Sequence, residues 1–206
     1  MNIETEQEQF WKGNFGNEYL TRNGGSLYVN SSINQFTEIL KDTENIISAL
    51  ELGANIGNNI EALHKLVPAI NLEGIEINAK AASILTNKNI CKVHNCSISD
   101  FKSNSLFDIT FTCGVLIHLN PSILQKAYET LYDYSKKYIL INEYYNPDPV
   151  EIKYRGHEKR LYKRDFAGEL LSKYKDLSLV NYGFFYNRDE KFKVATNTNW
   201  FLLKKP

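Results

Sequence analysis

Short apolar runs rich in β-branched residues alternate with helix-patterned stretches from about Ile46 onward. This alternation is typical of βαβ units and predicts a parallel sheet covered by helices. The predicted strands cover residues 46–52, 72–77, 91–95, 107–112 and 138–142. The predicted helices between them cover 58–66, 79–87 and 122–135, and Pro121 suits the entry to the last of these.

The pattern differs on either side of this alternating region. Residues 165–174 predict one more helix, and 177–186 and 198–204 predict two long strands joined through 187–189 as an antiparallel pair. Upstream, 4–12 and 32–41 predict helices, with Gly24 and Gly25 as a break between them. With 206 residues we expect one domain, comprising a helical extension or lid (1–45) and a Rossmann-like α/β core (46–206).

Charge and composition exclude several classes of function. Lys plus Arg total 24 and Asp plus Glu total 24, so we expect neither nucleic acid nor a membrane surface as partner. The acidic N-terminus has no basic and apolar signal pattern, which predicts a cytoplasmic protein. The three cysteines form no C-x-x-C pair and the four histidines have no metal-ligand spacing, so we expect no metal site.

A glycine-containing loop follows the first predicted strand and opens the first core helix. It reads E-L-G-A-N-I-G over residues 51–57. In doubly wound folds this junction lies at the carboxyl ends of the strands, where ligands bind. Gly53 allows close ligand approach and Gly57 allows passage into the helix, whereas the simplest alternative is a plain strand-to-helix turn.

Two carboxylates distinguish the loop from a plain turn. Glu51 ends the first strand, and Glu76 ends the second about twenty residues after the glycines, where ribose-binding acids occur. An acid there disfavours a 2′-phosphate and therefore NADP. The dinucleotide fingerprint G-x-G-x-x-G is absent because Asn55 occupies the second glycine position, so the loop suits a cation better than a pyrophosphate.

The combination resembles the class I S-adenosylmethionine (SAM)-dependent methyltransferases. The resemblance continues in the segment F-D-I-T-F-T-C-G-V-L-I-H-L over 107–119, which is similar to the fourth strand and following loop of that superfamily. It implies a seven-stranded, mostly parallel sheet with a C-terminal antiparallel hairpin, and SAM as cofactor with S-adenosylhomocysteine (SAH) as product. In that superfamily the strand-end acid orders the loop or binds the methionine ammonium.

The implied cofactor-binding residues lie in the glycine loop, after the second, third and fourth strands, and in the N-terminal extension. They are Trp11, Glu51, Gly53, Ala54, Asn55, Gly57, Glu76, Ile77, Ser97, Ile98, Cys113 and Gly114.

Segments outside the shared core are similar to the pseudaminic-acid-biosynthesis-associated methylase family. The match covers residues 8–19 and 22–23, together with 51–57, 114–121, 142–147, 154–158 and 163–168. This resemblance implies methylation of a small, anionic carbohydrate in surface-glycan biosynthesis, with a nonulosonic acid or a nucleotide-activated sugar as acceptor.

The acceptor side has three candidate catalytic residues. His118 follows the fourth strand and is the first candidate base, although it could instead cap a turn. Glu143 ends the fifth strand, and Tyr144 follows it. The next residues, Tyr145 and Asn146, are candidates for binding acceptor hydroxyls, with core packing as the alternative for both tyrosines.

A basic segment over 153–164 stands out in this neutral chain. Arg155, Arg160 and Arg164 could clamp a carboxylate or phosphate, and His157 lies between them. We therefore assign Arg155, His157 and Arg164 as candidate acceptor-binding residues. The alternative is a solvated loop and helix face.

Two other functions compete with methyl transfer. An NAD-dependent sugar dehydrogenase or epimerase would share the wound core, and Tyr132 and Lys136 have the Y-x-x-x-K spacing of such enzymes, but the glycine fingerprint is missing. A non-catalytic methyltransferase-like module that binds a pathway enzyme would have no need for the cofactor loop.

Overall fold

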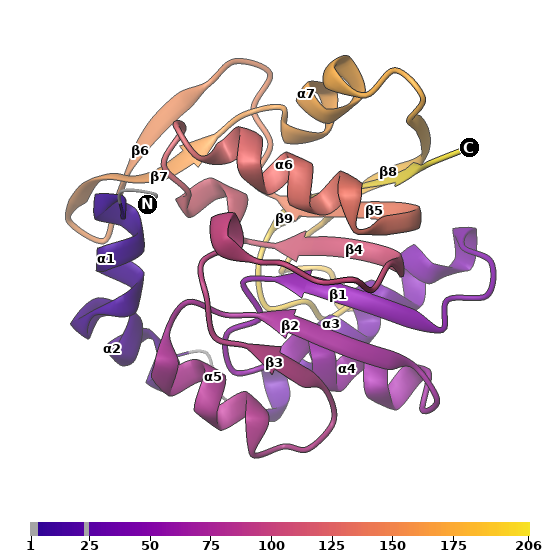
Figure 1. The fold of residues 1–206 in the computed structure, drawn as a ribbon, viewed down its shortest axis with the longest axis horizontal. Helices are drawn as coiled ribbons and strands as arrows, with labels where there is room; N and C mark the ends of the chain where they lie inside the picture. The colour runs from indigo at the N-terminus through magenta and orange to yellow at the C-terminus, as the bar shows by residue number, and fades with distance from the viewer. Residues whose placement is uncertain (1–3, 23–24) are drawn as a thin grey trace.

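The computed structural model describes residues 4–22 and 25–206, and in this part of the chain seven strands form one sheet in the order β3-β2-β1-β4-β5-β9-β8 (Figure 1). The strands are β1 (Ser48–Leu52), β2 (Asn71–Ile75), β3 (Lys92–His94), β4 (Phe107–Cys113), β5 (Ser135–Glu143), β8 (Ser178–Phe185) and β9 (Thr198–Lys204). The first five are parallel, and β9 is antiparallel to both β5 and β8. The predicted fold class is therefore confirmed.

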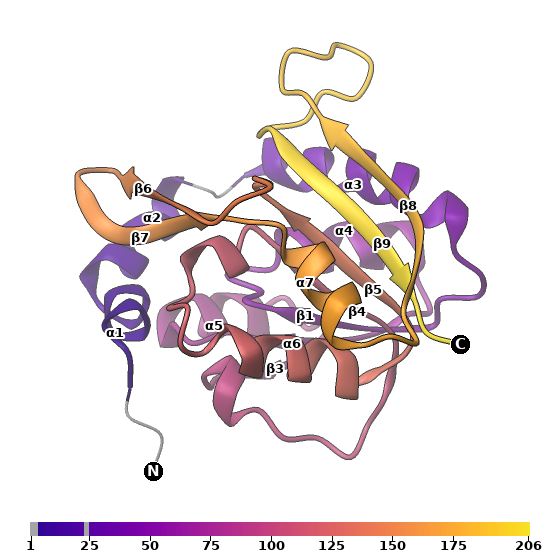
Figure 2. The same cartoon turned by 90° about the horizontal axis from the view of Figure 1, so that it is seen from above.

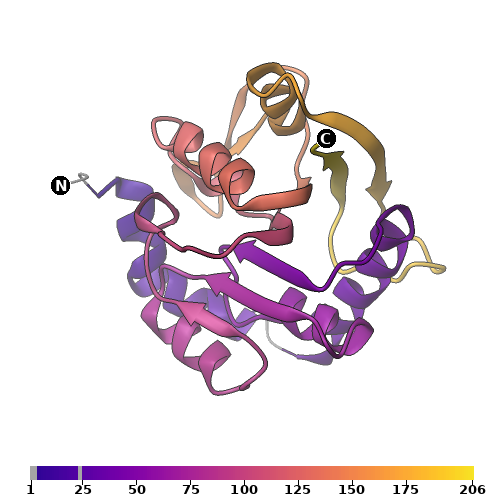
Figure 3. The same ribbon diagram turned by 45° about the vertical axis from the view of Figure 1, so that its right-hand side comes forward.

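Helices cover both faces of the sheet (Figures 2 and 3). On one face lie α3 (Ser26–Ile39), α4 (Asn58–Leu66) and α5 (Ala79–Thr86), and on the other lie α6 (Leu124–Asp133) and α7 (Phe166–Lys173). Strands β1, β2, β4, β5 and β9 contribute side chains to both cores; Ala49, for example, packs into the first and Leu50 into the second. Burial on both faces is typical of the central strands of such sheets.

Most predicted core elements have the expected positions. Helix α4 and strand β9 match the predicted bounds at both ends. The predicted helix over 122–135 is too long, because a turn precedes Leu124 and β5 already begins at Ser135. Helix α3 begins at Ser26, six residues before the predicted start, and a loop over 186–197 rather than a tight turn joins β8 to β9. Gly24 of the predicted break lies outside the described residues.

Three elements beside the sheet were not predicted. Helix α1 (Glu6–Lys12) was expected, but α2 (Asn14–Arg22) was not. The basic segment forms a separate hairpin of β6 (Val150–Tyr154) and β7 (His157–Lys163), so the alternative of a solvated loop and helix face is wrong in its secondary structure, although much of the segment is exposed. Short 3-10 turns at Leu40–Asp42, Ile98–Asp100 and Leu116–His118 complete the described chain.

The β6–β7 hairpin lies beside α1 and α2 at the carboxyl ends of the central strands (Figures 1 and 2). The Phe10 ring lies 5.0 Å from the His157 ring, and the Arg160 guanidinium lies 5.0 Å from the centre of the Phe10 ring. Among the helices of residues 4–22 and 25–206, none is long and apolar enough to span a membrane.

Candidate functional site

A cavity of about 290 Å³ lies where the carboxyl ends of β1, β2, β4 and β5 meet α1, α2 and α3. In doubly wound folds this edge of the sheet binds ligands. The predicted site residues that line the cavity are Trp11, Glu51, Gly53, Ala54, Asn55, Glu76, Ile77, Ile98, Cys113, Gly114, His118 and Tyr144. Gly57, Ser97, Glu143, Tyr145, Asn146, Arg155, His157 and Arg164 do not line it.

The glycine loop closes one wall of the cavity. Gly53 has φ +72°, and a Cβ there would lie 2.6 Å from a Val115 methyl. Gly57 has φ +81°, and its Cβ would lie 2.2 Å from Leu85. Both positions therefore require glycine. At Gly53 the backbone lies close to Val115 in the loop after β4, and at Gly57 the start of α4 packs closely against Leu85 of α5.

Glu51 has an unsatisfied oxygen in the cavity wall. Its Oε1 accepts a hydrogen bond from Asn59 Nδ2 at 2.6 Å, and Asn59 Oδ1 accepts one from the Ser32 hydroxyl at 2.7 Å. Its buried Oε2 has no hydrogen-bond partner among the described residues. Burial raises the pKa of the Glu51 carboxyl well above 4.5. A ligand cation would supply the partner that this oxygen lacks.

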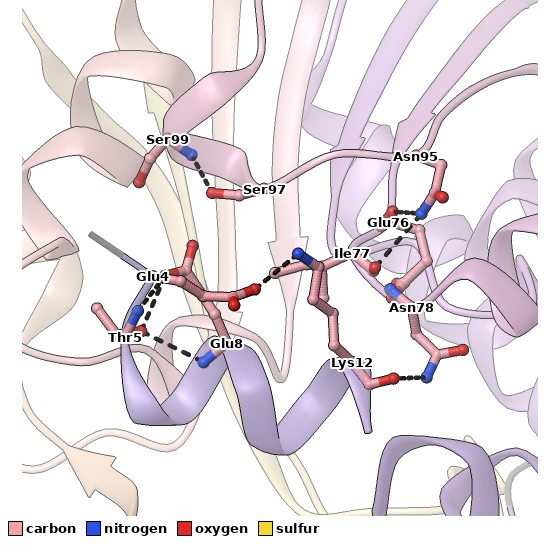
Figure 4. Close-up of polar contacts among 10 residues, drawn as sticks. All are labelled: Glu4, Thr5, Glu8, Lys12, Glu76, Ile77, Asn78, Asn95, Ser97 and Ser99. Atoms are coloured by element: carbon pink, nitrogen blue, oxygen red, sulfur yellow. Dashed lines mark hydrogen bonds and ion pairs between the residues drawn. The ribbon is translucent and has the colours of Figure 1, made fainter. Parts of the chain in front are cut away.

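Glu76 organises the neighbouring wall. Its carboxylate accepts hydrogen bonds from the backbone N–H of Asn55 at 2.6 Å and of Asn78 at 2.7 Å, which holds the glycine loop against the end of β2. Burial raises the pKa of this carboxyl. The two oxygens still have lone pairs for ligand hydroxyls. Asn95 Nδ2 donates to the Glu76 carbonyl at 2.8 Å and fixes the strand end (Figure 4).

Of the two site residues predicted after β3, Ile98 lines the cavity and Ser97 does not. Ile77 and Ile98 line the cavity with apolar side chains. Ser97 does not line it, because its hydroxyl caps the following turn and accepts the Ser99 N–H at 3.0 Å (Figure 4). The prediction that Ser97 contacts a ligand therefore has no support from its side-chain position.

His118 is held in one orientation. Its Nδ1 lies 2.6 Å from the Arg160 carbonyl oxygen, so Nδ1 carries the proton and Nε2 keeps a lone pair. Its ring packs 4.7 Å from the Trp11 ring and 4.8 Å from the Tyr154 ring. Burial lowers the pKa of His118 to about 4, so the imidazole is neutral at pH 7. A neutral, oriented imidazole at a cavity wall can accept a proton.

Glu143 is directed away from the cavity. Its carboxylate accepts hydrogen bonds from the backbone N–H of Val115 at 2.9 Å, Leu116 at 3.0 Å and Ile117 at 3.4 Å. It is 2% exposed, and burial raises its pKa to about 7. The side chain therefore holds the loop that carries His118, which differs from the sequence-based prediction of Glu143 as a catalytic residue of the acceptor site.

The predicted acceptor-binding residues are not brought together. Tyr145 is exposed beside Phe201, and Asn146 donates to the Asp148 carbonyl at 2.6 Å. Arg155 lies exposed over the Tyr154 ring in the hairpin turn.

The other two predicted acceptor-binding residues, His157 and Arg164, contact neighbouring side chains outside the cavity. The exposed His157 ring packs against Phe10 and Phe15. Arg164 Nε pairs with Glu169 at 2.6 Å. The expected arginine clamp is not formed, because the hairpin directs these cations outward or toward local partners.

Helices α1 and α2 cover the cavity, and Asn78 anchors them. Asn78 Oδ1 caps α5, while Nδ2 donates to the Trp11 carbonyl at 3.0 Å and to Asn17 Oδ1 at 3.2 Å. The weaker contact to the Lys12 carbonyl is seen in Figure 4. Gly16 allows the tight α1–α2 turn, since a Cβ there would lie 1.8 Å from the Trp11 carbonyl oxygen.

Sequence reasoning missed a polar group in the part of the cavity wall formed by α3, β5 and β9. It comprises Gln35 on α3, Asn142 on β5 and Thr198 on β9, which all line the cavity and are buried. A polar residue inside the apolar run of β5 was the available signal, because buried strands rarely carry an amide without a reason.

The sequence matches no known family model and no curated protein. The structure is similar to that of magnesium protoporphyrin IX methyltransferase (ChlM) from Synechocystis PCC 6803 with bound SAM, with TM-score 0.70, 10% identity and 100% of both chains covered. It is also similar to a SAM-dependent methyltransferase from Clostridium acetobutylicum ATCC 824, with TM-score 0.65, 16% identity and coverage of 93% of this chain and 99% of that one.

A third similar structure is N-methyltransferase NodS from Bradyrhizobium japonicum WM9 with bound SAH. Its TM-score is 0.65 at 13% identity, and the match covers 92% of this chain and 97% of NodS. At these identities the similarity shows the fold: the chain has the Rossmann-like fold of class I methyltransferases.

Proposed function

We propose that this chain is a SAM-dependent methyltransferase. The observation that carries the proposal is the cavity wall in which the orphaned Glu51 Oε2 and the Glu76 carboxylate lie at adjacent strand ends. A ligand that fits must present a cation to one acid and hydroxyls to the other. SAM has both, in its methionine ammonium and its ribose, and structures with this fold hold SAM or SAH.

The wall residues have matching roles in this proposal. Glu51 would pair with the ammonium and Glu76 with the ribose hydroxyls, while Ile77 and Ile98 would enclose the adenine. The loop through Gly53, Ala54 and Asn55 and the segment at Cys113 and Gly114 would enclose the methionine part. Trp11 would close the site from the lid. Gly57 would contribute through the shape of the loop alone.

Methyl transfer from a sulfonium requires mainly that the protein position the acceptor, because the methyl group is already activated. The cover formed by α1 and α2 excludes water from the acceptor. His118 is the proposed base, since its Nδ1–H is committed to the Arg160 carbonyl and its Nε2 is free to take a proton from an attacking hydroxyl. Tyr144 would shape the acceptor wall, and Glu143 is a positioning residue for the His118 loop.

We further propose a small, anionic sugar as acceptor, such as a nonulosonic acid or a nucleotide-activated sugar of surface-glycan biosynthesis, methylated in the cytoplasm. The resemblance of the outer segments to the pseudaminic-acid-associated family supports this acceptor. A second support is a more open groove of about 370 Å³ that shares Tyr144, Ala195 and Thr196 with the cavity. Lys163 lines this groove and would pair with the anion.

The competing dehydrogenase function loses its main support. Tyr132 donates a hydrogen bond to Asp176 and stacks on Tyr174, and Lys136 is exposed near the start of β5. Both lie at the amino end of β5, whereas the cavity lies at its carboxyl end. They do not form a catalytic pair at this cavity.

A thermal-shift comparison of SAH with NAD tests the cofactor. SAH at ~100-fold over its dissociation constant should add about 2.7 kcal/mol, which raises the melting temperature by roughly 5–10 °C for a chain of this size. NAD should give no shift. A shift with NAD alone would replace the proposal with the dehydrogenase, and no shift with either would favour the non-catalytic module.

His118→Asn separates binding from catalysis. The variant should keep its SAH affinity and lose at least ~100-fold in methyl transfer, as expected when a general base is removed. Equal transfer rates for the variant and the parent would remove His118 from the mechanism.

A further inference from the structure

We infer that Asn142 and Thr198, supported by Gln35, form the inner acceptor subsite and take an uncharged group that donates a hydrogen bond, a hydroxyl or an amide N–H. This inference rests on the proposed methyl transfer and specifies which part of the acceptor enters the cavity.

The first observation is a pair of unsatisfied buried oxygens. Asn142 is 2% exposed, and its Nδ2 donates to Gln35 Oε1 at 3.1 Å, while its Oδ1 has no partner among the described residues. Thr198 is 6% exposed, and its hydroxyl oxygen also has no hydrogen-bond partner among the residues that the structure describes. Buried polar atoms are normally paired, so two orphans in one cavity wall indicate a ligand that pairs them.

The second observation is the register of the sheet, which places the two residues together. Asn142 pairs with Trp200 and Glu143 pairs with Asn199 across the antiparallel β5–β9 ladder, so Thr198 follows directly at the carboxyl end of β5. Side chains alternate along a strand, which puts Thr198 on the same face as Trp200. Asn142 and Thr198 therefore face α3 and the cavity, whereas Glu143 faces the opposite side.

The third observation is the charge of the cavity wall. Within residues 4–22 and 25–206, neither lysine nor arginine lines the cavity, although Glu8, Glu51 and Glu76 do. His118 also lines the cavity. Its ring is buried, and its described hydrogen bond is to a main-chain carbonyl and not to an acidic side chain. A carboxylate or phosphate bound in this cavity would have no lysine or arginine to pair with among the described lining residues, and it would add a negative charge to a wall that already holds carboxylates. The group bound here is therefore not an anion, and in the anionic sugar proposed above it is an uncharged hydroxyl or amide.

The subsite is separate from the polar contacts proposed for the cofactor. The hydrogen-bond network of Glu51 includes Asn59 and Ser32, and the Glu76 carboxylate accepts hydrogen bonds from backbone N–H groups. Neither network includes Asn142 or Thr198. An anionic acceptor then enters with its uncharged end first. Its charged end stays in the outer groove beside Lys163.

The test replaces one orphaned oxygen without changing shape. Thr198→Val removes the hydroxyl, and Thr110→Val is the matched control, because Thr110 is a buried strand threonine whose hydroxyl donates to the Leu131 carbonyl at 2.7 Å. Both variants are compared with the parent by ligand-free thermal unfolding, SAH titration, and transfer of tritiated methyl from SAM to N-acetylneuraminic acid and UDP-N-acetylglucosamine.

Thr198→Val should melt at or above the parent temperature, because it removes an unpaired polar group, whereas Thr110→Val should melt lower. It should bind SAH within twofold of the parent and transfer methyl to either sugar at least tenfold more slowly. Asn142→Leu should show the same pattern in SAH binding and transfer.

Three results would overturn the inference. A melting temperature lowered as much as in Thr110→Val would mean that the protein itself satisfies the Thr198 hydroxyl. Weakened SAH binding would assign the residue to the cofactor. Unchanged transfer would remove it from the acceptor site. If the parent binds SAH but methylates neither sugar, the proposed acceptor class fails, and a lowered melting temperature or weakened SAH binding of Thr198→Val would still overturn the subsite.

Discussion

Replacing Glu51 by glutamine removes a charge from the cavity wall and leaves the side chain's shape. The amide oxygen can keep the hydrogen bond from Asn59 that Oε1 accepts now. The position of the orphaned Oε2 becomes an NH₂ group, which offers protons where a ligand ammonium would also offer protons. Glu51→Gln therefore removes the proposed ion pair and nothing else that the described residues provide.

The size of the effect follows from the strength of a charge-assisted hydrogen bond. A hydrogen bond to a charged group contributes about 1.5–3 kcal/mol, which corresponds to a roughly 10- to 150-fold rise in the dissociation constant of SAH. The pH dependence should change as well. Burial raises the pKa of the Glu51 carboxyl well above 4.5, and an ammonium pairs with the ionised form of this carboxyl. SAH affinity of the parent should rise with pH until the carboxyl is ionised in the free protein, and that of Glu51→Gln should not.

Isothermal titration calorimetry with SAH at pH 6, 7 and 8 measures both effects, and two buffers of different ionisation enthalpy report the released proton. Glu73→Gln is the control, because Glu73 is a buried carboxylate on β2 that pairs with His94 at 2.6 Å and does not line the cavity. Its SAH affinity should equal that of the parent. Dissociation constants for Glu51→Gln within threefold of the parent at pH 8, with no difference in proton release, would refute the assigned role.

Other substitutions test the scaffold of the site. Burial raises the pKa of Glu143 from 4.5 to about 7, so its contribution to stability is fully present below pH 4.5 and is lost as the pH rises through 7. His118, whose pKa burial lowers to about 4, changes the stability in the opposite direction, so the quantity to measure is the difference between the parent and Glu143→Gln in urea titrations. This difference in unfolding free energy should shift by about 3 kcal/mol against the parent over this range, and parallel pH profiles would contradict the assignment. Gly57→Ala should cost about 1–3 kcal/mol more than Gly114→Ala, since both have positive φ but only Gly57 would meet Leu85; equal losses would disprove that contact. Asn78→Ala should cost about 1 kcal/mol and speed amide hydrogen exchange in α1 before the sheet opens, and unchanged exchange there would show that the lid does not depend on this anchor.

The parallel core could be predicted because its strands are buried on both faces. Strands such as β1 and β4 are buried along nearly their whole length, and the helices between the strands have apolar residues at helical spacing. The glycine loop and the positions of Glu51 and Glu76 followed from the same alternation, since the carboxyl ends of parallel strands share one edge.

The elements outside the sheet could not be predicted in the same way. Helix α2 contains Gly16 and two asparagines, which have low helix propensity, and it forms against α1 and the core. The β6–β7 hairpin was hidden by its charge. Its signal was the alternation of Val150, Ile152 and Tyr154 before Arg155-Gly156, a pair with positive φ at both positions, as a two-residue hairpin turn requires.

Charge alone misled the prediction of the acceptor site. A row of cations in the sequence predicts a clamp only if its side chains converge, and strand alternation sends neighbours to opposite faces. Arg160 packs over Phe10, and Arg164 pairs with Glu169 on α7. Conversely, Asn142 and Thr198 carry no motif, and only the register between β5 and β9 reveals that they meet.

The bond that orients His118 comes from the main chain of β7, at the Arg160 carbonyl. A main-chain oxygen is present whatever side chain the position carries, so substitution of Arg160 does not delete the acceptor of this bond. The hairpin can therefore vary its outward-facing side chains, and with them the surface that a new acceptor meets first, while the imidazole keeps its tautomer. For an engineer this hairpin is the place to diversify, and any insertion or deletion that shifts its register is the change to avoid.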